Sequence, residues 1–136
     1  MATLTCDIVT PAECLFSEEC YMVAVPGESG HMGFLPGHAP LVSTLADGEV
    51  RLFSDSSTLT SRYACQGGYV QVTGEKVIVL ADRAVLADDI DASEAASKVT
   101  ELQAALAAAS EDDPQRRVIA YDLKWYQTLQ QVASGK

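Results

Sequence analysis

Residues 25–45 read VPGESGHMGFLPGHAPLVSTL, and this segment contains four of the nine glycines, three of the five prolines and both histidines of the 136-residue chain. Glycine adopts backbone conformations that a Cβ atom forbids, and proline fixes φ without donating an amide proton. The segment is therefore predicted to be a tightly bent loop. Its apolar side chains are too many for a solvated loop, so we expect it to pack against its own domain or a partner; they are Met32, Phe34, Leu35, Leu41 and Leu45.

Short segments on both sides of this loop alternate between apolar and polar residues, which is the pattern of half-buried strands. Asp47-Gly48 is a strong turn signal and is predicted to join two of these strands as a hairpin. A series of short strands at regular spacing predicts a β-sandwich or a flattened barrel. The strand candidates are residues 3–8, 20–25, 41–46, 49–52, 59–66, 69–73 and 76–81.

After residue 88 the periodicity changes to that of amphipathic helices. Asp91 and Glu94 have the spacing of a capping box, and Pro114 suits the first position of a second helix capped by Asp113. The loop between the helices is short, so they are predicted to be antiparallel neighbours. The apolar stripes are Ala95, Val99, Leu102, Leu106 and Ala109 in the first helix and Val118, Tyr121, Trp125, Leu129 and Val132 in the second, widened by Ile119, Leu123 and Tyr126.

These patterns predict an α+β chain, mainly β, with two domains. An antiparallel β-sandwich is expected over residues 1–88, and an antiparallel two-helix hairpin over residues 89–136. Two isolated helices bury little core of their own, so the hairpin is expected to lean on the β-domain or on a partner.

The charge balance restricts the class of partner. Nine Lys and Arg residues against 19 Asp and Glu residues give a net charge of −10, which argues against nucleic acid and anionic lipid. No apolar run is long enough for direct membrane insertion, and no signal peptide is evident. The four cysteines show no C-x-x-C spacing and are expected to be reduced thiols.

The residues that carry chemistry do not form a recognisable active site. His31 and His38 lack the further ligands that a metal site needs, so His38 is expected to hydrogen-bond backbone while His31 is exposed. No G-x-S-x-G nucleophile elbow and no P-loop is present. We therefore predict no catalytic, metal-binding or cofactor-binding residues. A small hydrolase built on His38 remains a weak alternative.

Four segments nevertheless resemble the epsilon subunit of F-type ATP synthases. They are residues 33–41 (GFLPGHAPL), 67–72 (GGYVQV), 77–84 (VIVLADRA) and 7–11 (DIVTP) with Phe16. The resemblance implies a β-sandwich followed by a helical hairpin. It also implies a non-catalytic part of the central stalk, which couples ion translocation through the c-ring to ATP synthesis and inhibits ATP hydrolysis.

The resemblance further implies partners and a location. The sandwich would bind the gamma subunit and the c-ring, and the hairpin would reach the catalytic beta and alpha subunits, all at the cytoplasmic face of the cell membrane as a peripheral complex. The residues so assigned are Glu28, His31 and Met32 for the c-ring, Leu35, Pro36 and His38 for gamma, and Arg116, Arg117 and Lys124 for the catalytic subunits.

One departure bears on cofactors. Some members of that family open the first helix with an I-D-x-x-R-A motif that helps to bind ATP, but here residues 90–95 read IDASEA. Glu94 stands in place of the arginine, and a carboxylate repels phosphate, so we expect no cofactor and at best weak binding of ATP by the hairpin. The alternative function is a free-standing β-sandwich binding module unrelated to ATP synthase, which co-purification with gamma would distinguish.

Overall fold

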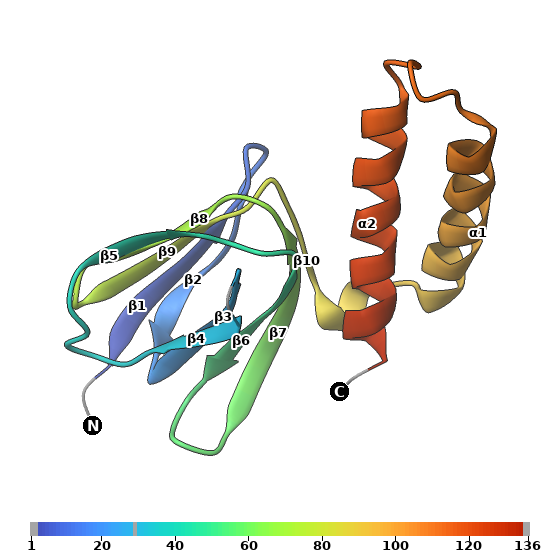
Figure 1. The fold of residues 1–136 in the computed structure, drawn as a ribbon. Helices are drawn as coiled ribbons and strands as arrows, with labels where there is room; N and C mark the ends of the chain where they lie inside the picture. Colours follow the sequence, from blue (N-terminus) through green and yellow to red (C-terminus); the bar gives the residue numbers. More distant parts are fainter. Residues whose placement is uncertain (1–2, 29, 135–136) are drawn as a thin grey trace. The chain divides into compact units, whose positions relative to one another are not determined.

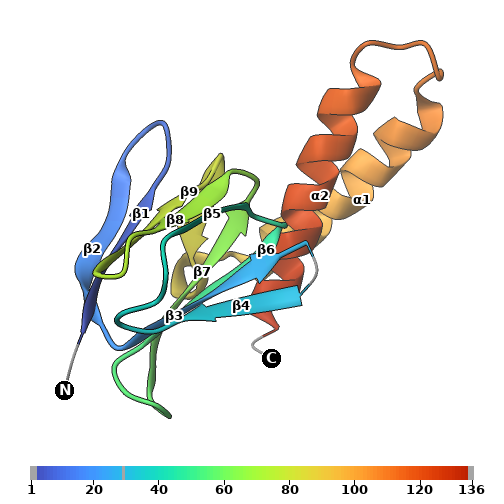
Figure 2. The same cartoon turned by 60° about the vertical axis from the view of Figure 1, so that its left-hand side comes forward.

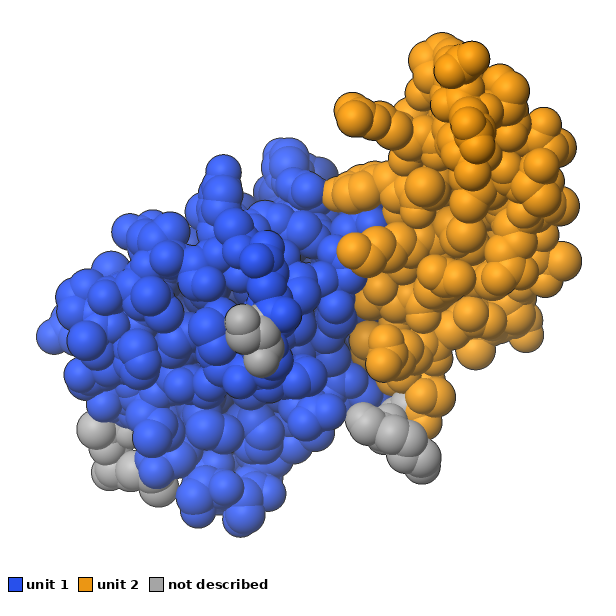
Figure 3. Space-filling view, in the orientation of Figure 1, with its two compact units in different colours: residues 1–87 blue, residues 88–136 orange. Residues whose placement is uncertain are grey.

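The computed structural model describes residues 3–28 and 30–134. It divides into two compact units, which meet in sequence at Ala87 and Asp88 (Figure 3). The first unit is a two-sheet β-sandwich and the second is a pair of helices packed against each other (Figure 1). The predicted fold class is confirmed.

Ten strands form two five-stranded sheets in the described part of the first unit. All neighbouring strands are antiparallel except β1 and β9, which are parallel. The first sheet has the order β2 (Cys14–Cys20), β1 (Leu4–Val9), β9 (Lys76–Leu80), β8 (Tyr69–Val72) and β5 (Leu41–Thr44). The second has the order β10 (Arg83–Leu86), β7 (Leu59–Gln66), β6 (Gly48–Phe53), β3 (Met22–Gly27) and β4 (Gly30–Phe34).

The core lies between the two sheets and consists of the inward half of each alternating strand. In β1, for example, Leu4, Cys6 and Ile8 are buried while the residues between them are half-buried. A fully buried Val, Leu or Ile side chain stabilises the fold by roughly 1.5–3 kcal/mol. The other strands supply mainly valines to this core: Val23, Val25, Val50, Val70, Val72, Val77 and Val79.

The hairpin predicted at Asp47-Gly48 is wrong. β5 belongs to the first sheet and β6 to the second, so this turn carries the chain from one sheet to the other. The Asp47 carboxylate accepts a hydrogen bond from the Gly67 amide at 3.1 Å, and the Ala46 amide donates to the Pro26 carbonyl at 2.8 Å. These long-range hydrogen bonds, invisible to a local pattern, decide the direction of the turn.

Three strands were missed by the sequence patterns: β2, β4 and β10. Of these, β4 lies inside the segment predicted to be a loop, so the loop prediction is wrong for residues 30–34. Here the chain pairs with β3 from Gly27 opposite Gly30 to Val23 opposite Phe34. Tertiary pairing therefore overrides the weak strand propensity of glycine.

A short 3-10 helix (Ala87–Asp89) leads into α1 (Ala92–Ala108) and α2 (Arg116–Ala133). The predicted N-cap of α1 is confirmed, because the Asp91 carboxylate accepts a hydrogen bond from the Glu94 amide at 3.0 Å. The second helix begins two residues later than Pro114, and Asp113 instead accepts from the Gln115 amide at 2.8 Å. No helix in the described ranges is both long and apolar enough to span a membrane.

The apolar stripe predicted for α2 is correct in its C-terminal half and wrong in its N-terminal half. Trp125, Leu129 and Val132 are buried, but Val118 is 52% exposed and Tyr121 is 39% exposed. The stripe of α1 is buried only at Ala95 and Val99. A 3.6-residue period identifies which residues share a face, but it does not say how far along the helix that face is covered.

The turn between β7 and β8 generates a stability prediction. Gly68 has φ = +96°, and a Cβ there would lie 1.7 Å from the Leu80 carbonyl oxygen. Gly37 has a similar φ of +86° with no atom within 4 Å of its virtual Cβ. Gly37→Ala should thus lower the free energy of unfolding by about 1–2 kcal/mol, from backbone strain alone. Gly68→Ala should lower it by more than about 3 kcal/mol, because the backbone must move.

Urea unfolding followed by circular dichroism measures both losses. Equal losses in the two variants would contradict the close approach at Gly68.

Candidate functional site

Residues 35–38 form a tight turn at the end of β4. The His38 amide donates to the Leu35 carbonyl at 3.1 Å, Pro36 occupies the second position, and Gly37 has φ = +86° at the third. This is the residue pattern of a type II turn. The Gly37 amide donates to the Gly74 carbonyl at 2.8 Å, which ties the turn to the β8–β9 connection. The turn presents Leu35, whose exposed fraction is 43%, on a fixed backbone.

The side chain of His38 packs against a core residue. Its ring meets the ring of Phe34 edge-on, with centroids 5.0 Å apart, and Phe34 itself is buried. The Nδ1 atom of His38 donates to the Ala39 carbonyl oxygen at 2.7 Å. The prediction that His38 bonds to backbone while His31 is exposed is confirmed.

Glu28 lies in the β3–β4 connection and His31 is the second residue of β4, both at the opposite end of that strand from the turn. Both are exposed, and Glu28 accepts a hydrogen bond from the Thr44 hydroxyl at 3.2 Å. Met32 differs from them, because it is half-buried and packs against the sandwich core. It supports the connection from within instead of forming its surface.

Apart from Met32, which is the central residue of β4, the two sets of predicted site residues therefore lie towards opposite ends of one strand. β4 has five residues, and four intervals of 3.3–3.4 Å place its end residues about 13 Å apart. It is also an edge strand that pairs with β3 on one side, and Figure 2 shows it at the margin of its sheet. The structure brings Leu35, Pro36 and His38 together, but separates them from Glu28 and His31.

The three predicted cationic residues of the hairpin also differ from one another. Arg117 and Lys124 are exposed. Arg116 is half-buried, and its Nη1 atom donates to the carbonyl oxygens of Leu106 at 3.2 Å and Ala109 at 3.1 Å. These carbonyls lie at the C-terminal end of α1, where Leu106 also accepts from the Ala109 amide at 3.3 Å, so Arg116 caps that helix with a positive charge.

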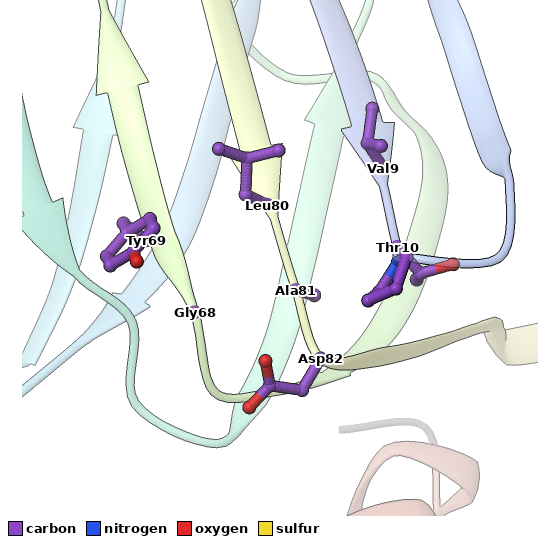
Figure 4. Close-up of a pocket in the computed structure, with 8 residues that line it drawn as sticks. Val9, Thr10, Gly68, Tyr69, Leu80, Ala81 and Asp82 are labelled. Atoms are coloured by element: carbon purple, nitrogen blue, oxygen red, sulfur yellow. The ribbon is translucent and has the colours of Figure 1, made fainter.

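The sandwich also has a surface hollow that the sequence patterns did not predict. It has a volume of about 540 Å³ and lies where β1, β8 and β9 end or begin (Figure 4). The sequence does carry a signal for it, since Val9, Tyr69 and Leu80 are apolar at outward positions of their strands and lie side by side in register. The hollow is lined by Val9, Thr10, Pro11, Gly68, Tyr69, Leu80, Ala81 and Asp82.

The hollow does not have the arrangement of a catalytic site. It contains no histidine, cysteine or lysine, and the Thr10 hydroxyl donates to the Glu13 carbonyl at 3.3 Å. Across residues 3–28 and 30–134, no group of three or more His, Cys, Asp or Glu side chains is placed to hold a metal ion. This hollow of the first unit is a concave and mainly apolar surface.

Comparison with known proteins identifies the family. Residues 3–87 match the family described as ATP synthase delta/epsilon chain, beta-sandwich domain. The ATP synthase epsilon chain of Desulforamulus reducens is 41% identical over 115 residues, which cover 84% of this chain and 86% of that one. The ATP synthase epsilon chain of Granulibacter bethesdensis is 37% identical over 107 residues, which cover 79% and 78%. The chain belongs to the ATP synthase epsilon chain family. It is a non-catalytic subunit of the central stalk.

Two solved structures share the fold of this epsilon chain. One comes from the cryo-EM structure of the Euglena gracilis mitochondrial ATP synthase, with a TM-score of 0.79, 22% identity, and coverage of 96% of this chain and 81% of that one. The other comes from the central stalk and c-ring of the Tetrahymena thermophila enzyme, with a TM-score of 0.57, 8% identity, and coverage of 96% and 93%. The fold is thus retained where little sequence identity remains.

The capping contact of Arg116 generates a prediction with a matched neighbour. Arg116→Ala removes two charge-assisted hydrogen bonds to half-buried carbonyls and should destabilise the last turn of α1 by about 1 kcal/mol. Hydrogen exchange of the Ala109 amide should then accelerate roughly five-fold. Arg117→Ala removes an exposed side chain and should change that rate by less than about two-fold. Equal protection of the Ala109 amide in both variants would show that Arg116 does not cap the helix.

Proposed function

We propose that this epsilon chain couples ion translocation through the c-ring to ATP synthesis and restrains ATP hydrolysis by the catalytic subunits. The observation that carries the proposal is the pair of exposed surfaces at the two ends of β4, on a chain of this family that shows no catalytic arrangement in its described residues. One strand in this arrangement serves two different rotor partners. The complex is peripheral to the cell membrane, at its cytoplasmic face.

The c-ring surface is proposed at Glu28 and His31, with Met32 beneath them. Two exposed polar side chains on a connection that is anchored by Thr44 suit a contact with polar loops, and the half-buried methionine keeps the connection in place. The structures from Tetrahymena and Euglena contain relatives of this fold together with c-rings.

The gamma surface is proposed at Leu35, Pro36 and His38. A rigid turn that exposes a leucine beside a half-buried proline loses little conformational entropy on binding, so more of its contact energy is retained as affinity. The ring contact with Phe34 orients His38 before any partner arrives.

The inhibitory contact is proposed at Arg117 and Lys124, joined by Arg116 when the hairpin opens. Arg117 and Lys124 are seven residues apart, which places them on one face of α2. Exposed ion pairs with an acidic partner are worth only about 0–1 kcal/mol each, so inhibition is partial and sensitive to salt. Arg116 binds α1 in the folded hairpin and is free for a partner only after that contact breaks.

The hairpin is not proposed to bind ATP. Glu94 is exposed in the first turn of α1, and its amide is already bonded to Asp91. The absence of more than weak ATP binding remains a prediction, which a calorimetric titration tests.

The c-ring surface is tested by the double variant Glu28→Ala with His31→Ala. Both side chains are exposed, so the free energy of unfolding should change by less than about 0.5 kcal/mol per site. Removal of two contacts should weaken binding to the c-ring by roughly ten-fold, which corresponds to about 1.4 kcal/mol. ATP-driven ion pumping in membrane vesicles should fall with it.

Glu18→Ala is the control for this experiment, because Glu18 is an exposed carboxylate on the far edge strand β2. Pumping equal to that of the unchanged chain in the double variant would remove Glu28 and His31 from the c-ring contact.

The hairpin is tested by deletion of residues 89–136. The first unit has its own core, so assembly and ATP synthesis should persist. Hydrolysis should rise roughly two- to five-fold, since one or two exposed ion pairs supply on the order of 1 kcal/mol. Arg117→Ala with Lys124→Ala in the complete chain should raise it in the same direction by a smaller factor. Hydrolysis no faster after the deletion than before it would make the hairpin a structural brace.

A further inference from the structure

Two cysteines lie together inside the sandwich, on neighbouring antiparallel strands. In the register of β1 and β2, Cys6 is opposite Glu18 and Leu4 is opposite Cys20. The two cysteines are therefore diagonal neighbours on the same face of the sheet. Both face the core, with exposed fractions of 0% for Cys6 and 5% for Cys20. All four cysteines of the chain are reduced.

The two thiols interact with each other. A hydrogen bond joins them, and this bond lowers the pKa of Cys20 while it raises the pKa of Cys6, to which burial adds a further increase. Cys20 is thus the member of the pair that becomes a thiolate, and the thiolate is the reactive form. Cys65, in the same core, has its pKa raised to about 12 by burial. Cys65 therefore stays protonated and is the least reactive of the three buried thiols.

Burial alone would protect this pair, so access depends on β2. That strand lies at the edge of its sheet and pairs with β1 on one side. Of its seven residues, Cys20 is the single one that is buried. An edge strand with so few buried side chains opens at a lower free energy than the whole domain. Opening of β2 exposes Cys20 and Cys6 and leaves the central strands paired.

We propose that Cys6 and Cys20 are a redox-active dithiol, which small disulfides such as oxidised glutathione convert to a cross-strand disulfide. In the first step the Cys20 thiolate attacks one sulfur of the small disulfide and displaces its other half as a thiolate. In the second step Cys6 loses its proton and attacks the Cys20 sulfur of the mixed disulfide, which releases the second small thiolate. The protein loses two electrons and two protons, and the small disulfide becomes two thiols.

The product ties an edge strand to its neighbour. Diagonal positions have Cα atoms about 7–8 Å apart, slightly beyond the usual range for a disulfide, so β2 must shift towards β1 as the bond forms. An edge strand can make this shift because no strand among the described residues pairs with its other side. The bond is accordingly expected to be reversible by a small thiol, which attacks a strained disulfide readily.

The test uses the complete chain with Cys14→Ser, which removes the exposed cysteine that would otherwise react first. The folded protein is incubated with oxidised glutathione, its remaining thiols are blocked with N-ethylmaleimide, and it is digested with a protease that cleaves after glutamate. Cleavage after Glu13, Glu19 and Glu28 separates Cys6 from Cys20, whereas trypsin finds no site before Arg51. Mass spectrometry should show residues 1–13 linked to residues 20–28, and excess reduced glutathione should release them.

Two further variants in the Cys14→Ser chain complete the design. Cys65→Ala should leave the linked peptide unchanged, and Cys20→Ala should abolish it. A folded Cys14→Ser chain that yields no linked peptide overturns the proposal. A link that joins Cys65, or one that forms only in denaturant, overturns it as well.

Discussion

The β-sandwich depends on a junction where three connections pass from one sheet to the other. The connections at residues 45–47, 67–68 and 81–82 each run between the two sheets, and backbone hydrogen bonds join them. Leu45 donates to Gly68 at 3.0 Å, Gly67 to the Asp47 carboxylate at 3.1 Å, and Asp82 to Gln66 at 2.9 Å. No side chain fits at Gly68, beside the Leu80 carbonyl. The apolar hollow lies beside this junction, because Gly68, Ala81 and Asp82 are among its lining residues.

β4 is an edge strand of the second sheet, and its two ends are fixed in a different way. An edge strand offers unpaired backbone groups, and its ends are the least constrained parts of the sheet. Here the following turn is anchored to Gly74 and Phe34, and the preceding connection to Thr44. Both ends are thereby fixed without being buried. Fixed but exposed ends suit the two binding surfaces that we propose for this single strand of five residues.

The sequence is sufficient to predict features whose cause is local. Alternation in Leu4–Ile8 and the cap at Asp91 are properties of a few neighbouring residues, and both were predicted correctly. Features with a distant cause were missed. The direction of the turn at Asp47 depends on a hydrogen bond from Gly67, twenty residues away, and β4 forms because β3 pairs with it. Of the candidate site, the histidine environment was predictable, but the half-buried state of Met32 depends on the core beneath it.

If the hairpin is the switch that we propose, a single weak contact within it carries weight. α1 is rich in alanine and buries only two residues, so packing alone gives it a modest preference for the folded form. Arg116 adds two hydrogen bonds at the point where the helices must separate. A switch requires states that differ by only a few kcal/mol, and a contact of about one kcal/mol is then a substantial part of the difference. Arg116, which the family resemblance assigns to an external partner, therefore also stabilises the folded hairpin, and in the switch that we propose it would leave the first contact to make the second.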